Sequence, residues 1–299
     1  MAPISLFTAL LAAAPLVHGH YSFIRLKTNG VWHEPLQYIR NKTSPFDEKQ
    51  FVDSNFLWRY YNWPTYFLDF PDSVRCGRGN LDHAKETQVL TIKAGDEVEI
   101  AHLRSDPSEW DNGMFECADD RGACDHRPYY RTDFNHPGPL IIHLSKVPEG
   151  QDIKTYDGSG EWVKIHSRGL VSAKERPIKW ELYVDEPPHL KFKIPAQTPP
   201  GQYLMRMDVL MAGMLNKYIK IGELGSFGQM YPTCAQLNIL SQSTAQLPQG
   251  VLIPEIFAPE APGMTHSSEM QHFQSIDEGY RYPGGPRWTG EEVVEDIPI

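Results

Sequence analysis

The fold of this chain is restricted above all by short stretches in which apolar and polar residues alternate. Val98 and Ile100 alternate with Glu97 and Glu99, and the segment 190–194 has the same period of two. Such a period puts the apolar side chains on one face of a strand, whereas a helix needs a period near 3.6 residues. Further strands are expected in five segments: 140–144, 162–165, 179–184, 202–211 and 235–240.

No segment shows a convincing helical stripe, and turn-forming residues separate the expected strands. The chain contains 23 Gly and 25 Pro, which suits long, well-shaped loops. Short strands joined by such loops are typical of an antiparallel β-sandwich. We therefore expect an all-β domain in residues 20–264. It is followed by an acidic segment, 265–299, with seven acidic residues and two Arg, which packs on the sandwich or trails from it.

The first nineteen residues have the features of a signal peptide. Residues 1–19 carry no charged side chain, and an apolar run from Leu6 to Val17 ends in Val17-His18-Gly19. This ending favours cleavage by a signal peptidase between Gly19 and His20. The run is too short for a transmembrane helix, and no later stretch reaches that length. The sequence therefore predicts a secreted, extracellular protein whose first residue is His20.

Cysteines and charge narrow the function classes. An oxidising compartment favours disulfides, and four cysteines allow three pairings. Cys117 and Cys124 are close enough to close a small loop, which leaves Cys76 and Cys234 for a long-range bond. Zinc ligation is the alternative, but no CxxC pair supports it. Asn41-Lys42-Thr43 is the one N-glycosylation sequon, so we expect a glycan on Asn41.

The net charge argues against two classes of partner. With 28 Lys and Arg against 38 Asp and Glu, the chain has a formal charge of −10 and no basic run. Nucleic acids and anionic membrane surfaces need a positive footprint. We therefore expect neither a nucleic-acid nor a membrane partner.

A chain that begins at His20 presents a free α-amino group and an imidazole on the same residue. These two nitrogens can chelate one metal ion, and planar sets of nitrogen donors favour copper. Because the pKa of an α-amine is about 8, the metal must displace a proton, and its affinity should fall on acidification. The alternative is a secreted chain that starts with His and binds no metal.

Two other segments offer partners for such a metal. His136 lies in Asn135-His136-Pro137-Gly138-Pro139, a rigid turn before an expected strand, and an ordinary turn His is the alternative. Gln229 and Tyr231 are two residues apart, so their side chains would point to the same side of a strand. A bond between Cys76 and Cys234 would hold that strand in place. For Tyr231 taken alone, a buried core position is the alternative.

Taken in order, these motifs resemble the fungal copper-dependent lytic polysaccharide monooxygenases of auxiliary activity family nine, many of which act on cellulose. The similarity extends over nearly the whole chain after residue 19. The segments that carry it are His20, Val74-Arg75-Cys76, Thr91-Ile92-Lys93-Ala94-Gly95-Asp96, His136-Pro137-Gly138-Pro139, Trp162-Val163-Lys164-Ile165, Pro200-Gly201-Gln202-Tyr203-Leu204-Met205-Arg206, 229–236 and 282–288.

The resemblance implies an immunoglobulin-like β-sandwich with a flat face that carries one copper ion. It assigns the metal to the amine and ring nitrogens of His20, to a nitrogen of His136, and to Tyr231 in an axial position. Gln229 and Tyr231 are then the catalytic side chains, with Gln229 as a hydrogen-bonding group beside the metal. The bond between Cys76 and Cys234 is the one expected in this family. The resemblance also implies a polysaccharide substrate, an external electron donor and a monomeric protein.

Two departures from the family pattern bear on activity. Aligning the segment 202–212 places Gly213 where the family carries a His that donates a hydrogen bond beside the Gln. Loss of one such donor can slow turnover roughly a hundredfold, and His143 and His166 are the nearby histidines that could replace it. The segment 261–266 also lacks the Tyr that the family often places on its flat face.

An early aromatic-rich stretch offers a substitute for that Tyr. Its residues either form another platform for sugar rings or fill the core. They are Phe56, Trp58, Tyr60, Tyr61, Trp63, Tyr66, Phe67 and Phe70.

Two functions remain as hypotheses. The first is secreted copper-dependent oxidative cleavage of a plant-cell-wall polysaccharide, either cellulose or another β-glucan or hemicellulose, using a reductant with peroxide or dioxygen. The alternative is a copper-binding protein of the same fold with weak or no cleavage, which Gly213 favours. A hydrolase gains no support, because no spaced pair of carboxylates is marked in the sequence.

Overall fold

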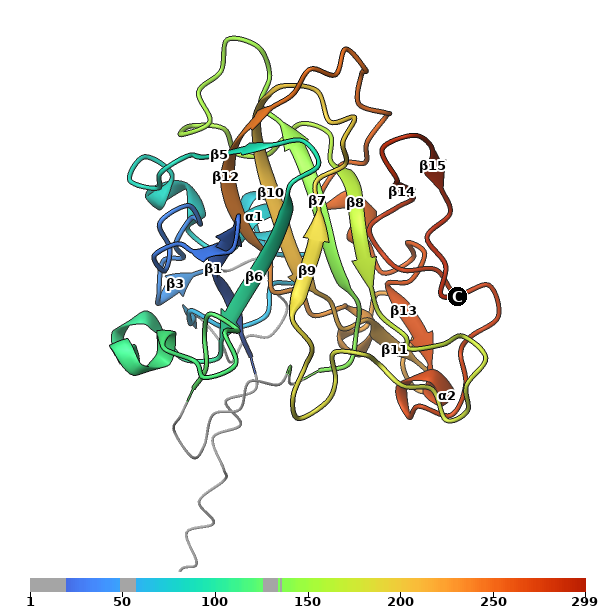
Figure 1. Ribbon diagram of the computed structural model, residues 1–299. Helices are drawn as coiled ribbons and strands as arrows, with labels where there is room; N and C mark the ends of the chain where they lie inside the picture. The colour runs from blue at the N-terminus through green and yellow to red at the C-terminus, as the bar shows by residue number, and fades with distance from the viewer. Residues whose placement is uncertain (1–19, 49–57, 126–133, 135) are drawn as a thin grey trace, which may run out of the picture.

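Two β-sheets packed face to face form the body of the protein (Figure 1). The computed structural model describes residues 20–48, 58–125, 134 and 136–299. The predicted signal peptide, 1–19, lies outside the described residues. The smaller sheet has the order β2-β1-β6-β9, with the strands β1 (Ser22–Thr28), β2 (Val31–Trp32), β6 (Glu97–Leu103) and β9 (Leu190–Lys193). The expected all-β sandwich is confirmed.

The larger sheet has the order β15-β14-β8-β7-β10-β12-β5. Its strands are β5 (Leu90–Lys93), β7 (Leu140–Lys146), β8 (Val163–Arg168), β10 (Gly201–Val209), β12 (Thr233–Leu240), β14 (Arg287–Trp288) and β15 (Val293–Val294). Neighbouring strands pair in an antiparallel sense, except that β5 pairs with β12, and β14 with β8, in parallel. Four of the five further strand segments expected from the sequence lie in this sheet.

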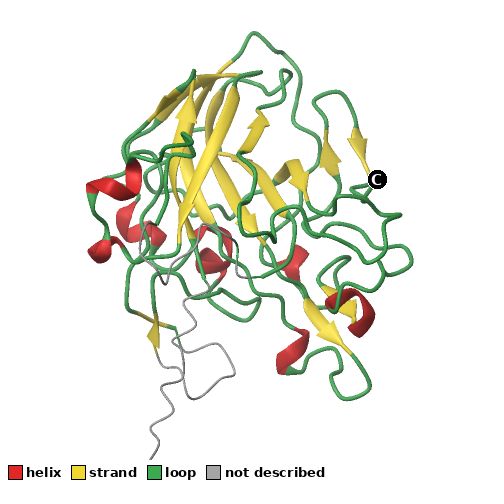
Figure 2. Cartoon of the chain, turned by 60° about the horizontal axis from the view of Figure 1, so that its bottom comes forward, coloured by secondary structure: helices red, strands yellow, loops and turns green. Residues whose placement is uncertain are grey.

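Short helices and small strand pairs surround the two sheets (Figure 2). The pairs are β3 (Phe46–Asp47) with β4 (Trp58–Arg59), and β11 (Gly213–Leu215) with β13 (Thr265–Ser267). The helices are α1 (Pro71–Cys76), α2 (Ser268–Gln271), η1 (Asn80–His83), η2 (Pro107–Glu109), η3 (Asn112–Phe115), η4 (Leu224–Ser226) and η5 (Glu255–Phe257). Among the described residues, no helix combines the length and apolar character needed to cross a bilayer.

Apolar residues fill both faces of the larger sheet. Leu140 and Ile142 of β7 point into the core between the sheets, together with Phe23 and Phe192 of the smaller sheet. Ile141, between them in sequence, belongs to a second cluster on the other side. Because that outer face is covered by loops, β7 reads as an almost continuous apolar run rather than an alternating one. The second cluster includes Val74, Trp162 and Phe257.

The predicted strand at 179–184 is wrong. The structure has one isolated bridge there, between Leu170 and Trp180, and the chain turns where the amide of Tyr183 donates to the carbonyl of Trp180. Pro177 and Pro187 flank the segment, and the chain beside it offers a partner for this one bridge alone among the described residues. The sequence patterns also did not predict β1, which begins at Ser22, two residues after His20.

The acidic segment 265–299 is integrated into the sandwich. β14 and β15 extend the larger sheet, and Trp288 belongs to the core between the sheets. The buried Asp296 forms an ion pair with the buried Lys164 of β8, at 2.8 Å. These contacts show that the negative charge of this segment is partly neutralised inside the protein.

Both cysteine pairs named from the sequence are bonded. Cys76, the last residue of α1, is joined to Cys234 of β12, with their Cα atoms 5.0 Å apart. Cys117 is joined to Cys124 and closes an acidic loop. Asp120 in that loop forms an ion pair with Lys27 of β1, so the loop is anchored on the smaller sheet.

Lys42 is a buried cation whose ionisation should affect stability. Its Nζ donates to Ser22 Oγ at 3.0 Å and lies 5.8 Å from the ring centroid of Tyr61. Burial, assisted by the charge of Arg78, lowers the pKa of Lys42 from 10.5 to about 7. The folded protein therefore binds this proton less tightly than the unfolded chain does. Burying the charged ammonium costs most below pH 7, and that cost fades as the pH rises towards 10.

We expect Lys42→Met to stabilise the protein most below pH 7. The substitution leaves Asn41 and Thr43 in place, so the glycosylation sequon stays intact. Between pH 7 and 10 its advantage over the wild type should shrink by up to about 1.4 kcal/mol per pH unit. Thermal unfolding from pH 5.5 to 9.5 measures the difference. Lys146→Met, at an exposed position, is the control and should show no such trend. An advantage of Lys42→Met that is the same at every pH would contradict the assignment.

Candidate metal centre

His20 lies two residues before the start of β1, and hydrogen bonds to its main chain and to Tyr21 hold this segment in place. The side-chain amide of Asn62 donates to the carbonyl oxygen of His20 at 3.4 Å and to that of Arg104 at 2.6 Å. The next residue, Tyr21, is buried, and its hydroxyl bonds both the N–H and the carbonyl of Val209 on β10. This segment is thereby tied to both sheets, through β1 in the smaller sheet and through Val209 of β10 in the larger one.

His136 reaches the same place from the loop before β7. A side chain at Gly138 would put its Cβ 1.8 Å from the carbonyl oxygen of Leu210, so only Gly lets this loop pack against the end of β10. The ring centroids of His136 and His20 are 5.7 Å apart. Burial, with a contribution from Arg104, lowers the pKa of His136 to about 4. Its imidazole is therefore neutral at pH 5 and above, as a metal ligand must be.

Tyr231 completes the group from the segment before β12. Its ring centroid lies 5.5 Å from that of His20 and 6.4 Å from that of His136. Its hydroxyl donates to Gln229 Oε1 at 2.9 Å, so these two side chains lie on the same side of the chain. Burial, together with Tyr66 and Asp208, raises the pKa of Tyr231 well above its ordinary value. The phenol therefore stays protonated. Tyr231 is also buried, so the alternative of a core position, considered from the sequence, applies as well.

The spacing of the two imidazoles fits a single metal ion. Two imidazoles bound to one ion from opposite sides have centroids roughly 6 Å apart, given metal–nitrogen bonds of about 2 Å. The described part of the chain contains no group of three His, Cys, Asp or Glu that could hold a metal. A free α-amine at His20 would supply a third nitrogen beside the two imidazoles.

An ion pair that the sequence reasoning missed positions Tyr231. Asp208 Oδ1 accepts the backbone N–H of Tyr231 at 2.7 Å, and Asp208 Oδ2 is 2.8 Å from Arg206 Nη2. Both charged side chains are fully buried in β10. Two opposite charges two residues apart in an otherwise apolar strand are the signal that could have indicated a buried pair on one face.

Part of the early aromatic stretch lies beside this centre. The Trp63 ring centroid is 6.1 Å from that of His20, and Tyr60, 54% exposed, stands 6.2 Å from Trp63. Tyr61, by contrast, is buried. Phe56 and the side chain of Trp58 lie outside the described residues. The stretch is therefore divided between core packing and an exposed aromatic surface.

Neither histidine considered as a replacement donor lies with Gln229. The Nε2 of His143 bonds the carbonyl of Gly284, and its ring contacts Phe257 on the outer face of the larger sheet. His166 stacks on Phe192 in the core region. Gly213 itself lines the same pocket as Gln229, but the direction of its missing side chain is filled. A Cβ there would lie 2.2 Å from the carbonyl oxygen of Ser226.

We expect any side chain at position 213 to destabilise the protein. Gly213→Ala should lower the free energy of unfolding by about 1–3 kcal/mol, since two backbone segments would have to separate. Gly213→His should then fail to restore a family-like donor. Gly225→Ala is the control, because its Cβ would meet only the side-chain end of Ile219. Chemical denaturation of the three variants measures the effect, and a Gly213→Ala protein as stable as the control would contradict it.

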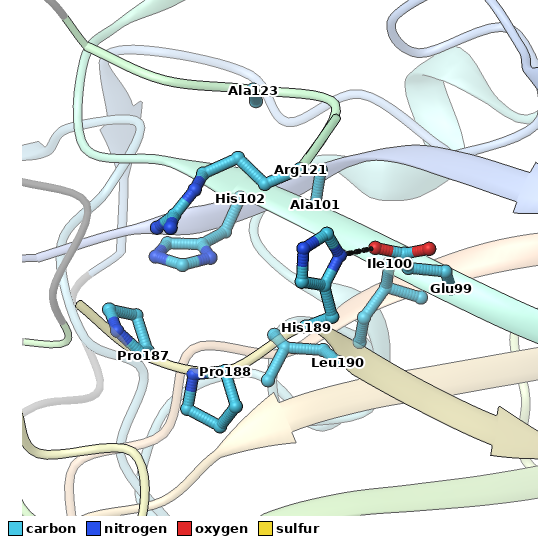
Figure 3. A pocket seen from close by; sticks show the side chains of 10 residues that line it. All are labelled: Glu99, Ile100, Ala101, His102, Arg121, Ala123, Pro187, Pro188, His189 and Leu190. Atoms are coloured by element: carbon cyan, nitrogen blue, oxygen red, sulfur yellow. Dashed lines mark hydrogen bonds and ion pairs between the residues drawn. The ribbon is translucent and has the colours of Figure 1, made fainter. Parts of the chain in front are cut away.

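A small pocket on the other sheet does not belong to this centre. It has a volume of about 20 Å³ and is lined by Glu99, His102, Arg121 and His189 among others. Figure 3 shows the His189 ring turned towards Glu99, to which it is hydrogen-bonded. The Oε2 atom of Glu99 also lies 3.6 Å from the Nζ atom of Lys27 and 3.6 Å from that of Lys191. This carboxylate is neutralised by its neighbours, and the space holds little more than one water.

The sequence matches the profile of Auxiliary Activity family 9 (formerly GH61) over residues 20–276. One similar protein is the AA9 family lytic polysaccharide monooxygenase G of Aspergillus tamarii, which is 28% identical over 94% of this chain and 69% of that protein. Monooxygenase U of Thermothielavioides terrestris is 27% identical over 93% of this chain and 95% of that protein. Monooxygenase E of Podospora anserina is 30% identical over 97% of this chain and 78% of that protein.

Solved structures share the fold. HiLPMO9B matches with a TM-score of 0.59 at 18% identity, over 91% of this chain and 100% of its own. A cellulose-active polysaccharide monooxygenase from M. thermophila matches with a TM-score of 0.54 at 19% identity, over 90% of this chain and 99% of its own.

Proposed function

The chain belongs to Auxiliary Activity family 9, the lytic polysaccharide monooxygenases, and from this we propose that it is secreted, begins at His20 and holds one copper ion there. The amine and ring nitrogens of His20 and a ring nitrogen of His136 would hold the ion, with Tyr231 as a further ligand. The observation that carries this proposal is the convergence of three rings from three distant segments, with centroids 5.5–6.4 Å apart. The family match also starts at residue 20.

The chain's own residues prepare this centre for its reaction. When bound, copper supplies one-electron redox chemistry towards peroxide or dioxygen, after reduction by an external donor. His136 presents a neutral ring without releasing a proton. The Tyr231 hydroxyl donates a hydrogen bond to Gln229 Oε1. The amide nitrogen of Gln229 can therefore donate to a polar group beside the ion. The half-buried surroundings of His20 and His136 limit access of water.

For the substrate we propose a plant-cell-wall polysaccharide, cellulose or another β-glucan or hemicellulose. Tyr60 and Trp63 support this choice, because they give an exposed aromatic surface next to His20. Sugar rings bind aromatic faces through their apolar C–H surfaces. One protein that shares the fold is a cellulose-active polysaccharide monooxygenase, which agrees with this choice.

Tyr60→Ala is expected to weaken adsorption to cellulose by about 3- to 10-fold, as loss of one aromatic contact of about 0.5–1.5 kcal/mol would do. Adsorption isotherms on insoluble cellulose without reductant measure it. Tyr183→Ala is the matched control, because Tyr183 is 42% exposed but stacks on Phe273. Equal adsorption of both variants and the wild type would remove Tyr60 from the substrate surface.

The experiment that tests the proposed function begins with the secreted protein. Its first residue is expected to be His20, and copper-loaded protein with reductant and peroxide should release oxidised oligosaccharides from cellulose, xyloglucan or xylan, detected by mass spectrometry. A different first residue, or products without oxidation, would overturn the proposal.

Gly213 favours a second candidate, a copper-binding protein of this fold with little cleavage. The donor that the family pattern expects at this position is absent, and Ser226 fills its place. Tight copper binding by a chain that starts at His20, with no oxidised product on any of these polysaccharides, would select this candidate.

A further inference from the structure

A pocket of about 560 Å³ is lined by Gln229, and the proposed function does not use it. Its walls come from β11, η4, α2 and the loop between β11 and η4, elements that lie together at one end of the larger sheet (Figure 1). Its apolar lining residues include Met211, Met214, Ile219, Leu224 and Phe227. Pockets of this size and composition hold small molecules.

The wall is preformed by the chain's own hydrogen bonds. Asn216 Oδ1 accepts the backbone N–H groups of Tyr218 and Ile219, at 2.7 and 2.9 Å. Glu223 Oε2 accepts the N–H of Lys220 at 2.7 Å. On the far side, the backbone of Ser226 packs on Gly213 where no side chain fits. The pocket therefore exists because Gly213 lets this loop close.

The polar groups in the wall have defined roles. Gln229 Oε1 accepts the Tyr231 hydroxyl, and Gln271 Oε1 accepts the N–H of His266 Nε2. Each amide is left with its NH₂ group as a donor to the pocket. His272 Nδ1 donates to the carbonyl of Ser268 at 2.6 Å, which leaves Nε2 as an acceptor. Across the described residues, these remaining atoms have no hydrogen-bond partner.

These features select the chemistry of a ligand. The lining residues include no Asp, Glu, Lys or Arg, so a charged ligand would be desolvated without compensation. Two thioethers and Phe227 suit an aromatic ring, since sulfur contacts ring edges favourably. Two amide donors require acceptor oxygens, and one imidazole acceptor requires a hydroxyl. A sugar carries more hydroxyls than these three groups, together with the hydroxyl of Tyr66, can satisfy.

We propose that this pocket binds a neutral, oxygen-substituted aromatic molecule with a single ring, such as a methoxyaryl alcohol. Its ring packs against the methionines, and its oxygens take hydrogen bonds from Gln271 and Gln229. Binding here contacts Gln229 and so lies one hydrogen bond from Tyr231. The site needs neither copper nor turnover, so it stands or falls separately from the proposed function.

Calorimetric titration of the copper-loaded protein with 3,4-dimethoxybenzyl alcohol, without reductant, tests the proposal. We expect a Kd of about 1 mM or tighter. The carboxylate analogue, 3,4-dimethoxybenzoate, should bind at least about 10-fold more weakly, because no lining residue offsets its charge. Absence of binding, or equal binding of both compounds, would overturn the proposal.

Two variants locate the site. Ile219→Trp fills the pocket and should abolish binding, while Ile221→Trp places the same ring at a position 52% exposed on the same loop and outside the pocket. Gln271→Glu keeps the acceptor for His266 but removes the amide donor, and should weaken binding about 10-fold. The Gln271→Glu variant keeps the proposal testable if the Ile219→Trp variant does not fold. Unchanged binding in Gln271→Glu and Ile219→Trp, or displacement of the probe by cellobiose, would contradict the assignment.

Discussion

Replacing His136 with Ala is expected to weaken copper binding by about 100-fold or more. Removing a residue that merely supports a ligand already costs 10- to 100-fold in metal affinity, and His136 is proposed as a ligand itself. No group of three metal-binding side chains exists among the described residues to replace it. Competition with a chelator at pH 6 measures the affinity, and electron paramagnetic resonance of the Cu(II) protein reports the loss of one nitrogen ligand.

The control for this prediction is another histidine outside the centre. His189 lies in the small pocket of Figure 3 and is bonded to Glu99, so His189→Ala should bind copper as the wild type does. The pH dependence adds a second check. Because the pKa of His136 is about 4, its ring needs no deprotonation above pH 5. Copper affinity should still rise between pH 5 and 8 as the α-amine loses its proton. Wild-type affinity in His136→Ala would refute the ligand set.

Asp208→Ala is expected to destabilise the fold by about 3–5 kcal/mol, as removal of one partner of a buried ion pair does. It leaves the fully buried guanidinium of Arg206 without its carboxylate, and Arg does not deprotonate to escape that cost. The backbone N–H of Tyr231 also loses its acceptor. Denaturant unfolding measures the stability, and the paramagnetic resonance spectrum of the copper form should change because Tyr231 shifts.

A double variant separates charge from packing. Arg206→Met with Asp208→Ala removes both charges, so it should be less destabilised than Asp208→Ala alone. Burial raises the pKa of Asp208, and the charge of Arg206 lowers it. Burying the ionised carboxylate therefore costs free energy that the ion pair with Arg206 partly offsets. A double variant less stable than the single one would mean that the pair is not the unit that positions Tyr231.

Local patterns predicted much of the sandwich. The alternation around Val98 and in the segment 190–194 placed β6 and β9, because a strand with one solvated face records its orientation in every second residue. The same reasoning failed at 179–184. There the alternation is present, but the chain has a partner for only one bridge. Propensity describes what a segment can form, and pairing depends on what lies beside it.

The residues that hold the centre together were harder to predict. Tyr21, Asn62 and Asp208 act through contacts with segments far away in sequence, such as Tyr21 with Val209. For Tyr21 and Asn62, nothing in the neighbouring sequence marks this role, whereas Asp208 is marked by the opposite charge of Arg206 two residues away in an otherwise apolar strand. Gly213 shows the opposite case. The sequence reveals a missing His, but only the packing of Ser226 against it reveals why a side chain is excluded.

By itself, the sequence determined the β class, the two cysteine bonds, the family and the residues that qualify as ligands. These depend on residue identity, order and local period, which are written along the chain. The family resemblance also predicted that His20, His136 and Tyr231 meet, and their ring centroids lie 5.5–6.4 Å apart in the structure. The tertiary structure alone decided that Arg206 and Asp208 are buried behind Tyr231, and that a neutral pocket opens beside Gln229. Each of these rests on segments that are tens to hundreds of residues apart, and only the packing of the two sheets and their loops brings them together.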